Sequence, residues 1–251
     1  MRITVLGKSP SWQDVDGACS GYLVEEQGCR MLIDCGSGVF AKLRRFTDYA
    51  AVDAVVLSHL HADHFLDLVP FSYALTYGPP RGAERAHPEL HAPPGARDTF
   101  RRVVGAWGDE ALIENAFALR EYDPDAPLHV GPFTLRFQLV PHFVTSHAIA
   151  VTAAAGDGRR FVFGGDSGPT ADLCTFARDA ELLLIEGTLP EPDVGHMTAA
   201  EAGDHGRQAG ARRLVLTHLS DELDAAWAEA EAERTFGGPV EIAREGAVYE
   251  L

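Results

Sequence analysis

The sequence predicts an α/β fold in which two similar halves share one core. Three observations lead to this prediction. Runs of apolar or alternating residues typical of strands come first, helical patterns then alternate with strands, and the same mixture returns in the second half of the 251 residues. Since no linker rich in Gly, Ser or Pro separates the halves, residues 1–251 are predicted to form a single domain.

Strands are assigned from apolar or alternating runs, and helices from apolar residues at helical spacing. The expected strands are 2–6, 20–25, 30–34, 53–57, 117–122, 133–140, 147–154, 160–163, 181–185, 212–217 and 240–250. The expected helices are 38–46, 64–76, 96–105, 170–178, 198–210 and 221–235. The fifth helix begins with a capping box, in which Glu201 follows the N-cap Thr198 by three residues. The Pro- and Gly-rich residues 77–95 are expected to be a loop with a short strand inside, either a rim or lid over a site or a plain long connection.

Composition and charge narrow the class of protein. Hydrophobic residues make up 46% of the chain and charged residues 23%, as in ordinary globular proteins. The 21 basic and 37 acidic residues leave a net charge of −16, which argues against a long nucleic acid as partner, because such binding needs basic side chains that neutralise phosphates. The four cysteines show no C-x-x-C spacing, and the chain shows no signal peptide and no bilayer-spanning run. A reduced cytoplasmic protein is therefore expected.

Side chains that bind metals gather in the stretch "SHLHADH" at 58–64. Because side chains two apart in an extended segment point the same way, His59 and His61 are expected to project together. The following turn then presents Asp63 and His64. Imidazole suits zinc, iron and copper, while a carboxylate suits harder ions or a bridging position. The spacing therefore favours a metal site over a loop that is histidine-rich by chance.

Three more apolar strands end in a side chain of the same kind, namely His142, Asp166 and His218. Catalytic groups often gather at the carboxyl ends of the strands in an α/β sheet. Any one of these residues alone is more often an ordinary hydrogen-bonded polar group. Three strand ends of one design, together with the 59–64 cluster, predict a shared site.

In type, spacing and order, these residues resemble the ligand set of the metallo-β-lactamase superfamily: His59, His61, Asp63, His64, His142, Asp166 and His218. The resemblance extends from Met1 to the C-terminus and implies a four-layer αββα sandwich with two divalent metal ions at one edge. It implies two groups of ligands: His59, His61 and His142 for one ion, Asp63, His64 and His218 for the other, and Asp166 as the bridge. Zn²⁺ is the expected ion, with Mn²⁺ or Fe²⁺ as alternatives. A hydroxide shared by the two ions is the nucleophile that the resemblance implies.

The stretch "GHMTAAEAG" that begins at Gly195 resembles the ribonuclease Z branch of this superfamily, in which a histidine opens a helix of small residues ahead of the last ligand. His196 takes that position. The resemblance implies that His196 assists phosphodiester cleavage, by protonating the leaving oxygen or stabilising the transition state. It also implies proton transfer by Asp63 and a homodimer. The alternative for His196 is a polar residue that merely starts a helix.

The sequence departs from ribonuclease Z between the third and fourth motifs. Ribonuclease Z inserts a long tRNA-gripping arm there, whereas only 23 residues separate His142 from Asp166. Together with the acidic charge, this favours a small phosphodiester such as 3′,5′-cyclic AMP as substrate. The alternatives are a ribonuclease Z-like RNA 3′-end endonuclease, a thioester or lactone hydrolase of the same fold, and a non-catalytic metal-dependent binding module.

Several residues outside the ligand set have two interpretations. Asp34 is expected to hydrogen-bond a ligand histidine or to order the loops, and Gly36 and Gly38 to allow tight turns beneath the metals. His147 is either a group that contacts a ligand or the substrate, or an ordinary residue at a strand end. Three aromatic residues could stack a base or simply pack in the core or rim: Trp12, Phe65 and Tyr73.

Overall fold

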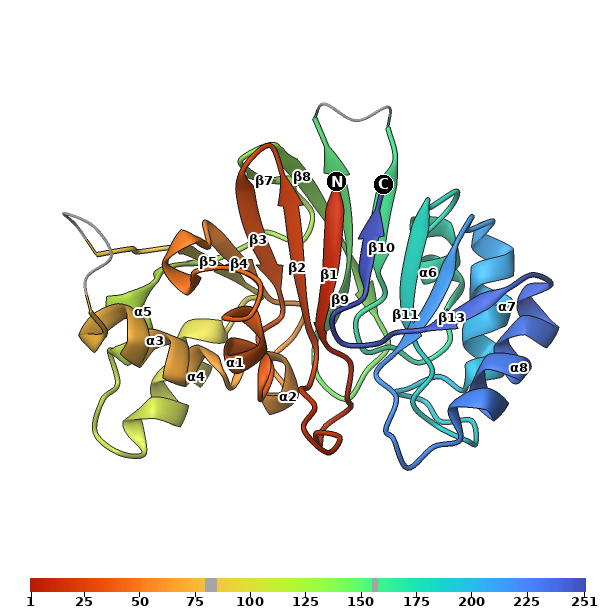
Figure 1. The fold of residues 1–251 in the computed structure, drawn as a ribbon, viewed down its shortest axis with the longest axis horizontal. Helices are drawn as coiled ribbons and strands as arrows, with labels where there is room; N and C mark the ends of the chain where they lie inside the picture. Colours follow the sequence, from red (N-terminus) through yellow and green to blue (C-terminus); the bar gives the residue numbers. More distant parts are fainter. Residues whose placement is uncertain (80–84, 155–157) are drawn as a thin grey trace.

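The chain folds into two seven-stranded sheets stacked face to face, with helices on both outer faces (Figure 1). The computed structural model describes residues 1–79, 85–154 and 158–251. The helices, the two sheets and the second set of helices are the four layers of the expected αββα sandwich, which the structure confirms. Both chain termini lie side by side at one edge, where the N-terminal ammonium of Met1 donates to the carbonyl of Leu251 at 2.8 Å.

The two sheets repeat one pattern of pairing. The first has the order β14 (Val248–Glu250), β1 (Arg2–Gly7), β2 (Gly21–Glu26), β3 (Cys29–Ile33), β4 (Ala54–Val56), β5 (Glu89–Ala92) and β6 (Ala118–Glu121). The second has the order β7 (Leu128–Val130), β8 (Phe133–Val140), β9 (Ser146–Ala153), β10 (Arg160–Phe163), β11 (Leu182–Glu186), β12 (Leu214–Thr217) and β13 (Val240–Ile242). In these orders each sheet has antiparallel pairing up to its fourth strand and parallel pairing beyond it. The prediction of two similar halves is confirmed.

Helices cover the outer face of each sheet (Figure 1). On the first sheet they are α1 (Val39–Leu43), α2 (Ala62–Phe65), α3 (Leu68–Tyr77), α4 (Ala96–Gly105) and α5 (Leu112–Ala116), with a 3₁₀ turn η1 (Tyr49–Ala51). On the second they are α6 (Ala171–Phe176), α7 (Ala199–Ala209) and α8 (Ala225–Phe236). The capping box at Thr198 and Glu201 is present at the start of α7. In the part of the chain that the structure describes, no helix has the length and apolarity that crossing a membrane requires.

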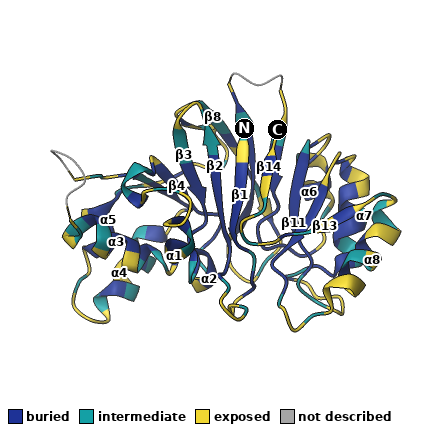
Figure 2. Cartoon of the chain, in the orientation of Figure 1, coloured by how far each residue is buried: buried dark blue, intermediate teal, exposed yellow. Residues whose placement is uncertain are grey.

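Apolar side chains form one layer between the sheets and one layer beneath each set of helices, and these layers are buried throughout (Figure 2). On β3, Met31 and Ile33 point between the sheets while Leu32 points to the helices. On β11, Leu182 and Leu183 divide in the same way. Because successive side chains of a strand alternate faces, a strand buried on both faces is a nearly continuous apolar run, as these sequences are.

The helix expected over 64–76 is wrong as a single element. The structure has two helices instead, α2 and α3. At their junction, backbone groups that would bond to each other in a continuous helix bond to the backbone of Cys35. The Cys35 N–H donates to the His64 carbonyl at 2.7 Å, and the Asp67 N–H donates to the Cys35 carbonyl at 3.1 Å. Pro70, which has no N–H to donate, lies in the first turn of α3 and was the sequence signal for this break.

The strand expected over 240–250 is also wrong as a single element, since β13 and β14 belong to different sheets. The chain crosses between the sheets at Gly246, which has a φ of +83°. Ala243 donates to Leu216 in the second sheet, whereas Gly246 donates to Val5 in the first. Glycine adopts this left-handed conformation without steric cost.

Other differences concern short elements. The expected strand within 77–95 is β5, and residues 80–84 of that stretch lie outside the described residues. The five-residue helix α5 and the three-residue strand β7 were not predicted, because such short segments carry no clear periodicity. The last helix begins at Ala225 instead of 221, since Asp224 caps it by accepting from the N–H groups of Ala226 and Trp227.

Candidate metal centre

All seven predicted ligand residues meet at one edge of the sandwich, where loops leave the carboxyl ends of strands in both sheets. Their ligand atoms form two groups, within each of which all atoms lie within 4.8 Å of one another. One group contains His59, His61, His142 and Asp166. The other contains Asp63, His64, Asp166 and His218. Asp166 is thus common to both groups, as a bridging carboxylate would be.

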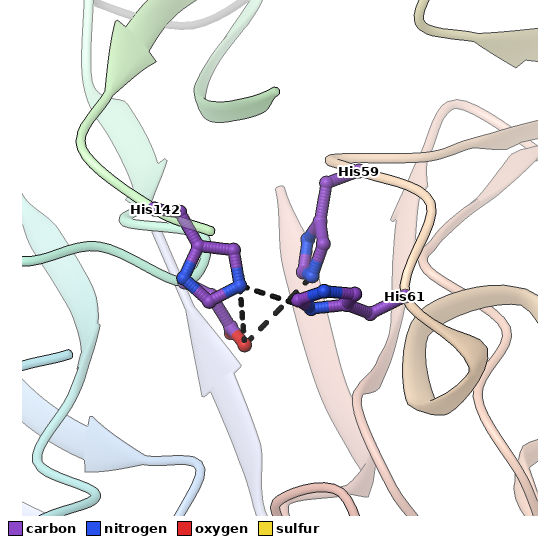
Figure 3. A group of neighbouring side chains, drawn as sticks. His59, His61 and His142 are labelled. Atoms are coloured by element: carbon purple, nitrogen blue, oxygen red, sulfur yellow. Dashed lines mark hydrogen bonds and ion pairs between the residues drawn. The ribbon is translucent and has the colours of Figure 1, made fainter. Parts of the chain in front are cut away.

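The first group joins the two halves of the fold. His59 and His61 come from the loop after β4, and His142 follows β8 of the other sheet; Figure 3 shows their three rings turned toward one another. The Nε2 of His142 lies 3.0 Å from the Nδ1 of His61. The ring centroids of His59 and His142 are 5.0 Å apart. The two nitrogens of His61 and His142, 3.0 Å apart, are stable at that distance only with a proton or a cation between them.

In the second group, each of two imidazoles lies close to both of two carboxylates. The Nε2 of His64 lies 3.3 Å from Asp63 Oδ2 and 3.3 Å from Asp166 Oδ1. The Nε2 of His218 lies 3.3 Å from Oδ2 of each of the same carboxylates. His218 holds this position with a φ of +57°, a left-handed conformation that is rare outside glycine.

Two histidines of the first sheet, His59 and His64, have their Nδ1 atoms hydrogen-bonded away from the cluster. His64 donates from Nδ1 to Asp34 Oδ2 at 2.7 Å. The hydroxyl of Ser58 donates to the same carboxylate oxygen at 2.8 Å, so it accepts from the Nδ1 of His59 at 3.1 Å. Since a neutral imidazole carries one N–H, the Nε2 of both rings is left with a lone pair directed into the cluster.

The histidines of the second sheet are oriented in the same manner. His142 donates from Nδ1 to the carbonyl of Gly195 at 2.7 Å. The hydroxyl of Thr188 donates to Glu186 at 2.6 Å and therefore accepts from the Nδ1 of His218 at 2.8 Å. Four inward-facing Nε2 atoms thus share the space between two carboxylates. Such hydrogen bonds on the far nitrogen are typical of metal-binding histidines, because they hold the tautomer and the ring direction.

The donor set fits a divalent cation. The Nε2 atoms of His59 and His64 are buried and have no hydrogen-bond partner, which is costly for a polar atom unless something else satisfies it. Burial lowers the pKa of His59 and of His61 and so favours the neutral imidazole, which is the form that binds metals. At His64, by contrast, burial is outweighed by the carboxylates of Asp166 and Asp34, which raise the pKa. Burial opposes ionisation of Asp63 and Asp166, but the surrounding imidazoles outweigh it and lower the pKa of both carboxyl groups.

Two backbone segments pass very close to each other beneath the cluster, at Gly36 and at Asp63. A Cβ on Gly36 would lie 1.8 Å from the carbonyl oxygen of Asp63, so only glycine fits there. Gly38 has a φ of +91° at the start of α1. Asp34 also has a positive φ, +56°, and accepts from both the N–H and the hydroxyl of Ser58, besides His64. The expectation that Asp34 orients a ligand histidine agrees with these contacts.

Glu186 is the residue that the sequence analysis missed. It is fully buried at the end of β11. Its carboxylate accepts from the N–H groups of Ser167 and Met197, from the hydroxyl of Thr188 and from the Nδ1 of His196. The sequence signal was available, since the apolar run "LLLIE" ends in a carboxylate just as the strands before His142, Asp166 and His218 end in a ligand-type side chain.

His196 lies beside the second group. Its Nδ1 donates to Glu186, with both carboxylate oxygens at 3.0 Å, and its ring stacks 5.7 Å from that of His218. Burial disfavours the charged imidazole, but the hydrogen bond and negative charge of Glu186 outweigh burial and raise the pKa of His196. With Nδ1 held by Glu186, the Nε2 is the nitrogen free for another partner.

A pocket of about 680 Å³ opens over the cluster. The wall near the cluster includes His61, Asp63, Asp166, His196 and His218. Among the described residues that line the pocket, none is Lys or Arg.

The structure distinguishes between the two interpretations of the aromatic residues and of His147. Trp12 lines the pocket, whereas Phe65 is buried and packs on Phe100. Tyr73 stacks on Tyr77 outside the described pocket lining. His147 also lies outside that lining; its N–H donates to the carbonyl of Ser58, so it supports the loop that carries His59.

Replacing Asp34 by Asn is expected to weaken metal binding about 10- to 100-fold, because His64 loses the carboxylate that holds its ring. Titration of metal-free protein with Zn²⁺ against a competing chelator measures the affinity. Asp53→Asn is the matched control, since Asp53 accepts from the backbone N–H of Arg30 away from the cluster. Equal affinities in the two variants would contradict the orienting role of Asp34.

The four-layer sandwich and its histidine–carboxylate edge define the class of this protein, a metal-dependent hydrolase. The family model described as "Beta-lactamase superfamily domain" matches residues 29–219, and the chain belongs to that superfamily. It is 33% identical over 260 residues to the "Probable metallo-hydrolase YhfI" of Bacillus subtilis (strain 168), with all of both chains covered. The crystal structure of YhfI superposes with a TM-score of 0.89, at 30% identity, and covers 99% of this chain and 98% of that one.

The ribonuclease Z resemblance is also confirmed. A ribonuclease Z of Myxococcus xanthus (strain DK1622) is 28% identical over 300 residues and covers 100% of this chain and 98% of its own. Human tRNase Z, short form, superposes with a TM-score of 0.77 at 21% identity, covering 100% of this chain and 99% of that one, which is a likeness of fold.

Proposed function

We propose that this protein binds two divalent metal ions, with Zn²⁺ as the first choice and Mn²⁺ or Fe²⁺ as alternatives. His59, His61 and His142 would hold one ion, and Asp63, His64 and His218 the other, with Asp166 between them. The inward-facing lone pairs and the two unpartnered Nε2 atoms support this assignment. When bound, such ions make hydroxide available near neutral pH and offset the charge that builds up on the attacked group.

The reaction that we propose is hydrolysis of a small phosphodiester, such as a 3′,5′-cyclic nucleotide. The observation that carries this proposal is the position of His196, which lines the same pocket as Asp63 and Asp166 and is held by Glu186. An imidazole with a raised pKa can keep a proton on Nε2 and deliver it to the oxygen that leaves phosphorus. Asp63, also on the pocket wall, is the residue proposed to accept a proton during the reaction.

A small substrate is favoured over a long RNA for three reasons. The pocket volume of about 680 Å³ lies within the range of small-molecule sites. The net charge is −16, and no Lys or Arg occurs among the described residues lining the pocket. The 23 residues between His142 and Asp166 contain β9 and β10, which pair within the second sheet and leave no length for an arm.

The test is a substrate screen with purified, metal-loaded protein. Cyclic AMP, cyclic GMP, bis(p-nitrophenyl) phosphate, a precursor tRNA, a thioester and a lactone are each offered with Zn²⁺ and with Mn²⁺. We expect turnover of the three small diesters and none of the tRNA. Cleavage of the tRNA to a mature 3′ end would instead establish the ribonuclease Z-like alternative. Turnover of the thioester or lactone alone would establish the carbonyl hydrolase, and no turnover at all would favour the binding module.

We also propose that the protein is a cytoplasmic homodimer in which residues 1–251 form one domain. Its four cysteines are free thiols, which agrees with a reducing compartment. Light scattering on the full chain in solution measures the oligomeric state.

A further inference from the structure

The pocket over the cluster is lined by two chemically different sets of side chains. Besides the histidines and carboxylates, its lining includes an apolar set, here called the apolar wall, made of Pro10, Trp12, Leu189, Pro190 and Leu223. These residues come from the β1–β2 connection and from the segments that follow β11 and β12. A phosphodiester has two ester groups, so one that reacts at the cluster must place the remainder of its structure somewhere in this pocket.

Trp12 is the largest side chain of the apolar wall, and 51% of it is exposed. Its loop is nevertheless held by hydrogen bonds to the segment after β12. Lys8 forms an ion pair with Asp14 and donates to the carbonyl of Leu219 at 2.7 Å. The N–H of Leu219 donates back to the carbonyl of Lys8 at 3.1 Å, and the N–H of Asp221 donates to Asp14 at 3.0 Å. An exposed indole on a braced loop is a prepared contact surface, because little order is lost when a ligand binds.

The charge of the pocket limits what the indole can contact. The described lining includes Glu222 and no Lys or Arg, so a second anionic group on the ligand would be repelled without compensation. An aromatic ring offers a face that binds planar ring systems by stacking. The wall therefore suits an uncharged planar ring attached to a phosphodiester that carries a single negative charge.

We propose that Trp12 determines specificity by stacking on the planar, uncharged ring of the substrate, such as a nucleobase. The proposal rests on the proposed function and deepens it, since it names the chemical group that the pocket selects: a diester with one negative charge and one flat ring. Trp12 acts on binding and has no part in the bond cleavage at phosphorus.

Kinetics with a matched pair of substrates test the proposal. For cyclic AMP, Trp12→Ala is expected to raise KM about 10-fold with little change in kcat, while Trp12→Phe keeps most of the affinity. For ribose 3′,5′-cyclic phosphate, which has the diester but no base, Trp12→Ala should leave KM unchanged. Trp107→Ala is the control, because Trp107 is 50% exposed and contacts Tyr73 instead of the pocket.

A binding measurement tests the same contact without turnover. In the variant Trp107→Phe, Trp227→Phe, Trp12 is the remaining tryptophan. We expect adenosine to quench its fluorescence saturably and ribose to leave it unchanged. If cyclic AMP is hydrolysed but Trp12→Ala changes KM equally for both substrates or for neither, the proposal for Trp12 is wrong and the proposed function stands. If no diester is cleaved, the proposed function is wrong, and the quenching by adenosine alone decides whether Trp12 binds a planar ring.

Discussion

Replacing Asp166 by Asn is expected to lower hydrolysis of bis(p-nitrophenyl) phosphate about 10³-fold or more and to remove at least one bound metal ion per chain. Asp166 is the residue common to both ligand groups, and its carboxylate lies 3.3 Å from the Nε2 of His64 and of His218. An amide is neutral and cannot bridge two cations as a carboxylate does. The loss follows because metal ions contribute several kcal/mol to the reaction, and about 1.4 kcal/mol corresponds to a factor of ten.

Metal content by mass spectrometry and initial rates on the same preparation measure both effects. Asp67→Asn is the matched control: Asp67 lies near the cluster in sequence, accepts from the backbone N–H of Phe40 at 2.8 Å, and belongs to neither ligand group. Circular dichroism of all three proteins shows whether each is folded. An Asp166→Asn protein that keeps full metal content and full activity would refute the assignment of Asp166 as the bridge.

Replacing His196 by Ala is expected to affect substrates according to their leaving group. For cyclic AMP, whose leaving group is a ribose alkoxide that needs a proton, kcat should fall about 10²- to 10⁴-fold. For bis(p-nitrophenyl) phosphate the loss should be only a few-fold, because p-nitrophenolate leaves without protonation. Metal content should be unchanged, since His196 is outside both four-residue ligand groups that share Asp166.

Replacing Glu186 by Gln tests whether the negative charge of Glu186 keeps His196 protonated, while leaving the shape of the site largely unchanged. Glutamine keeps an acceptor for the N–H groups of Ser167 and Met197 but removes the negative charge beside His196. We expect the same dependence on leaving group as for His196→Ala, with a smaller loss. Equal losses on both substrates would contradict proton donation and favour stabilisation of the charged transition state by His196.

Strand-end placement made most of the site predictable from the sequence. His59, His142, Asp166 and His218 each follow an apolar strand, and the seven expected residues converge because those strands end at the same edge of the sandwich. Periodicity likewise predicted most of the strands and the two similar halves, although it failed where one expected element proved to be two. The break before α3 and the crossing at Gly246 depend on hydrogen bonds to Cys35 and Val5, which are distant in sequence.

By itself, the sequence determined the α/β fold class from its periodicity, and the side-by-side placement of His59 and His61 from alternation along a strand. The superfamily and the full set of ligands followed from the resemblance of the motifs in type, spacing and order. Only the tertiary structure decided which nitrogen of each imidazole faces the cluster, that Glu186 holds His196, and that Trp12 forms a wall of the pocket. These features arise from contacts about 3 Å long between segments far apart in the chain. The stacking of the two sheets creates those contacts, and no local pattern of residues specifies them.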